Sequence, residues 1–165
     1  MKIFSRYDSN KVIFETESDF LSGLDLNGVN LKSANLTDLD LSLCNLENAN
    51  LEDAKLWGTN LEKTNLNNAR LVGATLIGAC LKNASLVEAN LIDTDLKDSE
   101  FWYADLSGAN LEKSNLGDAD FWHANLSNAK LLGANLFNAK FKDANVYGTT
   151  IVIDEDDIGT DGIFD

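Results

Sequence analysis

Large apolar residues recur at every fifth position of the chain, from Leu21 to Ile151. Leu fills most of these positions, and no insertion interrupts the spacing. The residue two positions before each of them is small, usually Ala, and the residue between the two is usually Asn or Asp. Self-similarity at a fixed period is the signature of a repeat architecture, so one repeated unit organises most of the chain.

A period of five residues excludes both a regular helix and a straight strand. Five residues advance an α-helix by about 140° beyond a full turn, so the leucines would be scattered around every side. In a straight strand, successive members of the series would point to opposite faces. The backbone must therefore turn once in each unit. Turns of constant hand wind it into a β-solenoid whose interior collects the large and the small residue.

The repeated motif, A-(D/N)-L-x-x, resembles the pentapeptide-repeat family. Two copies of it are Ala34-Asn35-Leu36-Thr37-Asp38 and Ala109-Asn110-Leu111-Glu112-Lys113. The resemblance implies an all-β fold, a right-handed four-sided parallel β-helix with four pentapeptides in each coil. We therefore expect residues 19–153 to form about seven coils, stacked at the inter-strand spacing into a rod about 30 Å long.

The residues before the repeats predict a β-hairpin cap over 1–18. Segments 2–7 and 11–16 are rich in β-prone residues, and the segment 8–10 between them has the chemistry of a turn. An open solenoid end exposes unpaired backbone groups, so a cap is expected there. We expect the hairpin to plug the N-terminal opening with four apolar side chains, those of Ile3, Phe4, Val12 and Phe14.

Two features distinguish the ends of the repeat region. Leu24, Val29 and Leu39 stand at positions that are small elsewhere, which predicts a wider opening at the N-terminal end. Residues 154–165 contain Asp and Glu but no Lys or Arg. We therefore expect an acidic C-terminal tail over 154–165.

Repeat positions also predict which interior side chains meet. Phe101, Phe121 and Phe141 are spaced by one coil and should stack on one another inside the solenoid. Cys44 stands at a small interior position and Cys80 at an outward one on another face. The two thiols should therefore not form a disulfide.

The net charge of the chain argues against some classes of binding partner. The 165 residues carry 27 acidic and 13 basic side chains, a formal net charge of −14. This charge opposes direct contact with a nucleic-acid backbone. No apolar run is long enough to span a membrane, and the first residues lack the basic-then-apolar order of a secretory signal. We therefore expect a cytoplasmic protein that binds neither nucleic acid nor membrane directly, and a monomer rather than a dimer.

The sequence offers little catalytic chemistry. His123 is the only histidine, and Cys44 and Cys80 are the only cysteines, too few for a four-ligand zinc site. No G-x-S-x-G, P-loop or paired-cysteine motif is present. We expect no enzyme activity, no cofactor and no metal site.

One group of outward residues is the first candidate for a partner site. At a spacing of one coil, three residues should lie directly beneath three others and bring four exposed aromatic rings together beside two carboxylates. Large aromatic side chains are enriched where proteins bind one another. An alternative is that the rings only stabilise neighbouring coils. The predicted residues are Glu100, Trp102, Tyr103, Asp120, Trp122 and His123.

A second candidate is apolar. Four large side chains follow their central residues on two neighbouring faces and should gather along one edge of the rod. They would serve as a self-association surface or a seat for a terminal segment, although single apolar residues are also normal on surfaces. The residues are Trp57, Val72, Ile77 and Ile92.

Three functional hypotheses follow. The leading one is a non-enzymatic module whose rigid surface binds a protein partner that the sequence does not name. The second comes from the resemblance: some family members imitate duplex DNA with an acidic rod and occupy the DNA site of topoisomerases such as gyrase. One face here carries four acidic residues and no base, namely Asp25, Glu47, Glu88 and Asp105. The third hypothesis is an uncharacterised enzyme.

Overall fold

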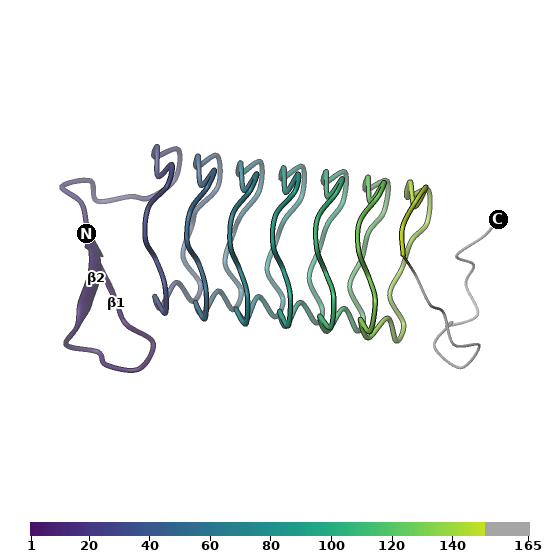
Figure 1. Cartoon of the computed structure of the whole chain (residues 1–165). Coiled ribbons are helices and arrows are strands. Elements are labelled where there is room, and N and C mark those ends of the chain that lie inside the picture. The colour runs from purple at the N-terminus through teal and green to yellow at the C-terminus, as the bar shows by residue number, and fades with distance from the viewer. Residues whose placement is uncertain (151–165) are drawn as a thin grey trace.

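The computed structural model describes residues 1–150. It contains two regular strands, β1 (Lys2–Phe4) and β2 (Val12–Glu15), followed by a long coil of turns and isolated β-bridges (Figure 1). No helix in this range is long and apolar enough to cross a membrane. The predicted tail, 154–165, and the end of the predicted repeat region, 151–153, lie outside the described residues.

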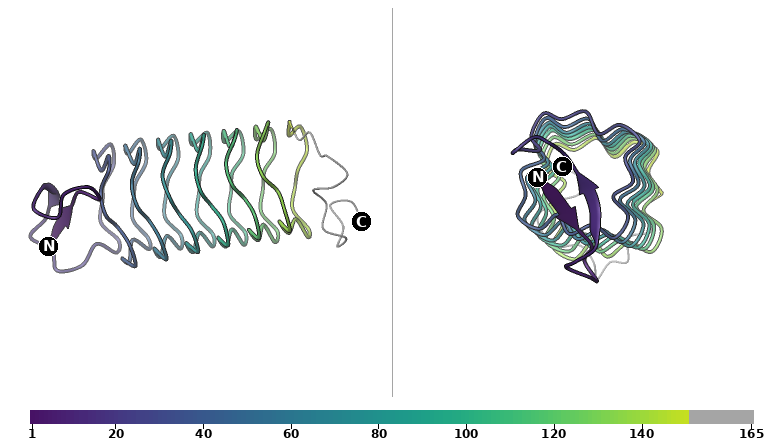
Figure 2. Two further views of the ribbon diagram at one scale, coloured as in Figure 1. Left: turned by 90° about the horizontal axis from the view of Figure 1, so that it is seen from below. Right: turned by 90° about the vertical axis from the view of Figure 1, so that its left-hand side faces the viewer.

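Backbone pairing at a spacing of twenty residues holds successive coils together. Asn45 pairs with Asn65, and Asn65 with Ser85, all in parallel. The N–H of Leu46 donates to the carbonyl of Asn65 at 2.7 Å, and the N–H of Asn65 donates to the carbonyl of Cys44 at 2.9 Å. Because this spacing equals four pentapeptides, equivalent repeat positions lie over one another (Figure 2). The chain is therefore an all-β solenoid.

The two apolar positions of each repeat fill the lumen. From Leu31 to Leu126 every central Leu or Phe is completely buried, and the Ala residues two positions earlier in these repeats are buried with them. Burial of each central side chain is worth about 1.5–3 kcal/mol. The partner position must be small, because a second large side chain would not fit an interior packed at near-crystal density.

Hydroxyl groups in the lumen are satisfied by the backbone. Thr59 Oγ1 donates to the carbonyl of Leu36 at 2.8 Å, and Thr64 Oγ1 donates to the carbonyl of Leu41 at 2.8 Å. An unpaired hydroxyl at such a site would cost about 1–3 kcal/mol. These bonds explain why Thr can replace Ala at the small interior position.

The predicted phenylalanine stack is confirmed. The rings of Phe101 and Phe121 lie 4.7 Å apart and those of Phe121 and Phe141 lie 4.9 Å apart, each pair within 7° of parallel. The three rings follow one another along one side of the lumen, so an exact repeat spacing on the sequence becomes a direct contact in space.

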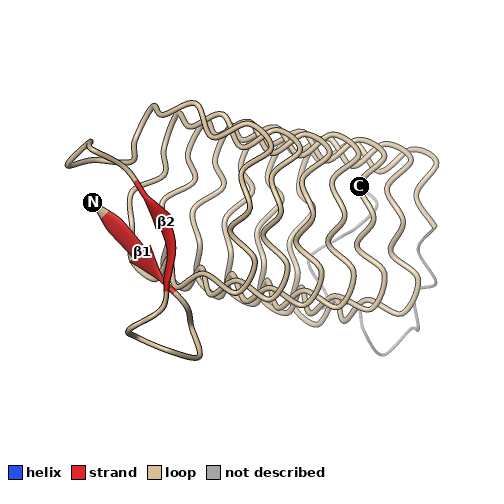
Figure 3. Ribbon diagram, turned by 60° about the vertical axis from the view of Figure 1, so that its left-hand side comes forward, coloured by secondary structure: helices blue, strands red, loops and turns tan. Residues whose placement is uncertain are grey.

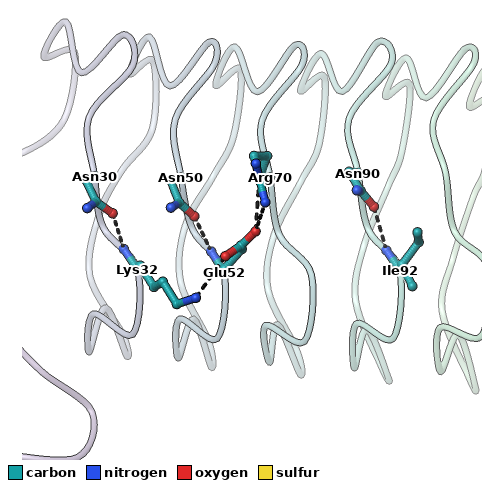
Figure 4. Close-up of polar contacts among 7 residues, drawn as sticks. All are labelled: Asn30, Lys32, Asn50, Glu52, Arg70, Asn90 and Ile92. Atoms are coloured by element: carbon teal, nitrogen blue, oxygen red, sulfur yellow. Dashed lines mark hydrogen bonds and ion pairs between the residues drawn. The ribbon is translucent and has the colours of Figure 1, made fainter.

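Each repeat contains a corner, and the Asn or Asp before the central residue helps to form it. Asn50 Oδ1 accepts the N–H of Glu52 at 3.1 Å, and Asn90 Oδ1 accepts the N–H of Ile92 at 3.2 Å (Figure 4). The residue after this contact has a positive φ, 54° at Asp53. Gly, Asn and Asp adopt that conformation at the lowest cost, which explains their frequency at the corners.

β1 and β2 pair antiparallel and form a hairpin at the N-terminal end of the solenoid (Figure 3). Asp8 closes the connection between them, because its carbonyl accepts the N–H of Lys11 at 3.1 Å and its Oδ1 accepts the N–H of Asn10 at 2.9 Å. An antiparallel bridge between Ser5 and Ala34 then attaches the hairpin to the solenoid.

Only half of the predicted plug enters the core. Ile3 is buried and Phe14 packs against the core, but Phe4 and Val12 are 38% and 40% exposed. The prediction for Phe4 and Val12 was wrong for a reason of register. Ile3 lies opposite Phe14 and Phe4 lies opposite Val12, with an irregularity between the two pairs, and neighbouring pairs point to opposite faces of a hairpin. One face alone meets the solenoid.

Leu24, Val29 and Leu39 distinguish the N-terminal opening from the middle of the rod. All three are partly buried and pack against the core, whereas the Ala residues at the same repeat position between Ala49 and Ala129 are fully buried. The opening therefore holds larger side chains than the lumen behind it.

Leu111→Asp should lower the free energy of unfolding by more than about 4 kcal/mol, because it places a carboxylate without a partner in the lumen. Leu132→Asp makes the same chemical change at a side chain that is 55% exposed and should cost less than about 1 kcal/mol. Denaturant midpoints followed by circular dichroism compare the two variants. A Leu111→Asp protein with the midpoint of the unchanged chain would contradict the placement of Leu111.

Candidate functional site

The six residues of the first predicted site lie together, and we call them the aromatic patch: Glu100, Trp102, Tyr103, Asp120, Trp122 and His123. Glu100 and Asp120 form a parallel bridge between neighbouring coils. The rings of Trp102 and Trp122 meet edge to face at 5.6 Å and 83°, and those of Tyr103 and His123 stack at 5.0 Å and 8°. The predicted vertical pairing of these residues is therefore present.

The rings of the patch are not equally exposed. Tyr103 is 51% exposed and His123 is exposed, whereas Trp102 and Trp122 are half-buried. The expectation of four exposed rings was wrong for the two tryptophans, because each indole is covered on one side by a neighbouring ring. Trp122 contacts Tyr103 at 5.3 Å between ring centres and His123 at 4.6 Å. The patch is consequently one packed surface of four rings.

Lys82 extends the patch beyond the predicted residues. Its ammonium group lies 4.0 Å from the centre of a Trp102 ring and 2.9 Å from a carboxylate oxygen of Glu100. The hydrogen bond to Glu100 raises the pKa of Lys82, so the lysine stays charged. The prediction missed Lys82, although it stands twenty residues before Trp102 and the coil spacing was the signal that could have found it.

Two polar groups at the patch are incompletely paired. The indole N–H of Trp102 is buried and has no acceptor among residues 1–150. His123 Nε2 lies 3.7 Å from a carboxylate oxygen of Asp143, beyond hydrogen-bond distance. Buried donors normally have a partner, so the unpaired indole N–H is a cost that the fold accepts at this place.

Tyr103 and His123 adopt the left-handed backbone conformation that other corners share. Their φ angles are 59° and 54°, in the left-handed region. That region costs an ordinary residue about 1–2 kcal/mol, and Asn or Gly would relieve much of it. Asn83 occupies the same corner position one coil earlier, twenty residues before Tyr103. Folding alone therefore does not favour aromatic residues here.

The second predicted site, the apolar cluster of Trp57, Val72, Ile77 and Ile92, is less open. Trp57 is 44% exposed and its ring faces the ammonium group of Lys55 at 4.1 Å, while the other three side chains are half-buried. The cluster presents one accessible ring, which offers a partner less contact area than the aromatic patch.

The potential for metal binding and catalysis rests on few groups. Within residues 1–150, no three His, Cys, Asp or Glu side chains gather as metal ligands. Cys44 and Cys80 are unbonded, as predicted, and burial raises the pKa of the Cys44 thiol. Cys44 Sγ donates to the carbonyl of Leu21 at 2.9 Å. The Cys44 thiol is thus part of the packed interior.

Comparison with known families identifies the repeat. A family model described as pentapeptide repeats matches eight copies, over residues 20–48, 44–83, 81–112 and 114–151. The chain belongs to the pentapeptide-repeat family. Comparison with curated protein sequences gives no match.

Solved structures of other pentapeptide-repeat proteins resemble the chain. HetL, involved in heterocyst differentiation regulation in the cyanobacterium Nostoc sp. strain PCC 7120, is 30% identical over 77% of this chain and 61% of its own, with a TM-score of 0.45. Rfr23 from the cyanobacterium Cyanothece 51142 is 30% identical over 78% of this chain and 84% of its own, with a TM-score of 0.37. The chain thus spans less than two thirds of the HetL structure.

Trypsin-treated QnrB1, a plasmid-mediated fluoroquinolone resistance protein, is 17% identical over 82% of this chain and 74% of its own, with a TM-score of 0.50. At that identity the likeness concerns the fold. Together with the family match, it places this pentapeptide-repeat protein among β-helix solenoids.

Replacing both Tyr103 and His123 by Asn should change the stability by no more than about 2 kcal/mol in either direction. Relief of the left-handed strain, about 1–2 kcal/mol at each position, is offset by the loss of three ring contacts, Tyr103–His123, Tyr103–Trp122 and Trp122–His123, each worth about 0.5–1.5 kcal/mol. Thermal melting measures the difference, with Phe101→Ala as a destabilised reference for an interior ring. A loss above about 2 kcal/mol in the double variant would show that the stacked pair is needed for the fold.

Proposed function

We propose that this pentapeptide-repeat protein is a non-enzymatic interaction module whose rigid surface presents the aromatic patch to a protein partner. The observation that carries the proposal is the gathering of four rings with Glu100, Asp120 and Lys82 at outward positions. The corner position needs no ring, since elsewhere it holds Lys63, Glu88 and Lys113 with the same positive φ. Trp and Tyr are also the residues that contribute most to protein interfaces.

The solenoid supports this role by holding the patch in place before a partner arrives. Trp102 and Trp122 contact each other, Lys82 bridges Trp102 and Glu100, and the backbone beneath them is bonded to the neighbouring coils. Side chains that are already ordered lose little conformational entropy on binding. The half-buried tryptophans would form the centre of the contact and Tyr103 its more exposed margin.

The finer features implied by the resemblance belong to the same proposal. They are the right hand of the solenoid, its four-sided section and its length of about seven coils at the usual inter-strand spacing. A cytoplasmic location and a monomeric state are consistent with the acidic charge of −14 and with a binding role.

Trp102→Ser combined with Trp122→Ser should abolish capture of the partner, because the change removes the two largest rings from the centre of the patch. The measurement is affinity capture from lysate of the organism that encodes the protein, with captured proteins quantified by mass spectrometry. Circular dichroism verifies that the double variant is folded.

Trp57→Ser is the matched control, since it makes the same substitution at an exposed tryptophan of the apolar cluster. It should retain the captured protein. Identical captured sets for the unchanged chain and the double variant would contradict the assignment of the patch.

The imitation of DNA is the second candidate. The face that carries Asp25, Glu47, Glu88 and Asp105 has no base among its residues. Duplex DNA carries one charge per about 1.7 Å of its axis, whereas four charges spread over a rod of about 30 Å are several times sparser. Asp25 Oδ1 and Asp105 Oδ1 also accept hydrogen bonds from Asn45 and Asn125. The aromatic patch is therefore the stronger candidate.

A DNA gyrase supercoiling assay separates the two candidates. We expect no change in supercoiling at micromolar protein, because the acidic face is too sparse to replace the DNA backbone. Inhibition that is relieved by Glu47→Gln with Glu88→Gln, and not by Trp102→Ser with Trp122→Ser, would favour DNA imitation over the aromatic patch.

A further inference from the structure

The first coil has an open backbone edge. In later coils, the residue before each central position bonds to the preceding coil with both of its backbone groups. Asn50, for example, donates its N–H to the carbonyl of Val29 at 2.9 Å and accepts the N–H of Leu31 at 2.7 Å. The first coil has only the hairpin before it, so its pairing depends on where the hairpin lies.

The hairpin pairs with one side of this edge. Phe4 accepts the N–H of Asn35 at 2.7 Å, and Arg6 donates its N–H to the carbonyl of Ser33 at 2.7 Å. The Arg6 guanidinium also donates to the carbonyl of Asp53 at 2.8 Å. These bonds replace a preceding coil for residues 33–35 only.

The neighbouring side of the edge is unpaired. Within residues 1–150, neither backbone group of Asn30 has a hydrogen-bond partner, and neither has the carbonyl of Lys32. In the next coil the equivalent groups of Asn50 and Glu52 are all bonded, including the carbonyl of Glu52, which accepts the N–H of Ser33 at 2.8 Å. Figure 4 shows Asn30, Asn50 and Arg70 at equivalent places on three successive coils.

A cleft of about 650 Å³ runs along this unpaired edge, between the first coil and the hairpin. Its wall on the coil side is the edge itself, and the loop and strand of the hairpin form the opposite wall. The residues that line it are Ser5, Tyr7, Asp8, Lys11, Val12, Ile13, Asn30, Lys32 and Ser33. A strand added here would pair with Asn30 and Lys32 on one side and contact the hairpin on the other.

The cleft is basic in an acidic protein. Lys11 forms no ion pair with any residue in the described range. Lys32 Nζ lies 3.0 Å from a carboxylate oxygen of Glu52, but Glu52 also pairs with Arg70 (Figure 4). The single negative charge of Glu52 therefore does not neutralise both bases. Asp8 is the single acidic residue in the lining. An anionic group is therefore favoured at this edge, although the chain as a whole carries −14.

The other two unpaired sides of the first coil lack this combination. Asp25 and Asp40 stand at the positions that correspond to Asn30, and within residues 1–150 their backbone N–H and carbonyl groups are also unpaired. Their own carboxylates would repel an acidic segment. Charge complementarity selects the side at Asn30.

We propose that this cleft binds an extended, acidic segment of a partner polypeptide by β-strand addition to Asn30–Lys32. The segment donates backbone N–H groups to the carbonyls of Asn30 and Lys32 and accepts the N–H of Asn30, as a preceding coil would. An acidic side chain of the segment lies between Lys11 and Lys32. This site is at the end of the rod and does not depend on the aromatic patch.

The test begins with a displayed library of random linear peptides, selected on the whole protein and counter-selected on the Lys11→Glu, Lys32→Glu double variant. We expect acidic peptides to be enriched. In fluorescence titrations they should bind the double variant at least about tenfold more weakly. Lys97→Glu with Lys113→Glu, the same charge change elsewhere on the solenoid, should leave their affinity unchanged.

Asn30→Pro tests the backbone contact, because it removes the N–H that has no partner within residues 1–150. It should weaken peptide binding at least about tenfold, whereas Asn30→Ala, which loses the same side chain and keeps the N–H, should not. Asn50→Pro is the folding control and should lower the melting temperature, because the N–H of Asn50 is bonded. If Asn30→Pro also melts early, amide exchange of Asn30 in the unchanged protein replaces it and should slow when peptide is added.

Three results would overturn the proposal. The first is a selection that yields no peptide whose binding requires Lys11 and Lys32. The second is that inorganic sulfate displaces the peptides from Lys11 and Lys32, and that peptide binding does not slow the exchange of the Asn30 amide. This would mean that the cleft is a site for small anions. The last is concentration-dependent self-association that excludes the peptides, which would mean that a second copy occupies the edge.

Discussion

Burial of one large apolar side chain in each pentapeptide is the interaction on which the whole molecule depends. The lumen admits one large and one small residue per repeat, because its walls are close enough to pack at crystal-like density. That restriction holds the register of each coil against the next, and the register in turn aligns the parallel backbone bonds between residues twenty apart. A slip by one residue would put a polar corner residue into the lumen.

Because of the same constraint, most outward positions contribute little to the stability of the fold. Asn and Asp there complete the corner turns, and most other outward side chains contribute little to the core. Sequence at these positions can therefore change without loss of the fold, and columns of side chains at fixed spacing become available for contacts. The aromatic patch uses two adjacent corners of this kind, with Tyr103 and His123 in a strained backbone that Asn would occupy more readily.

A solenoid differs from a closed barrel in that it has two ends with unpaired edges. The hairpin resolves this at the N-terminal end only in part, since it bonds to the first coil around Ser33 and Asn35 and leaves Asn30 without backbone partners within residues 1–150. The sides and the end of the rod thus offer different chemistry. The sides offer rigid side-chain surfaces, and the end offers backbone groups beside Lys11 and Lys32.

The sequence by itself determined everything that follows from an uninterrupted period. The buried series, the stack of Phe101 on Phe121 and the pairing of Trp102 with Trp122 were all predictable, because equal spacing along the chain becomes direct contact in space. The exposure of Phe4 and the open edge at Asn30 were decided by the tertiary structure alone. They depend on the register of the hairpin and on which part of the first coil it bonds to. Both are set by long-range bonds with no periodic signature in the sequence.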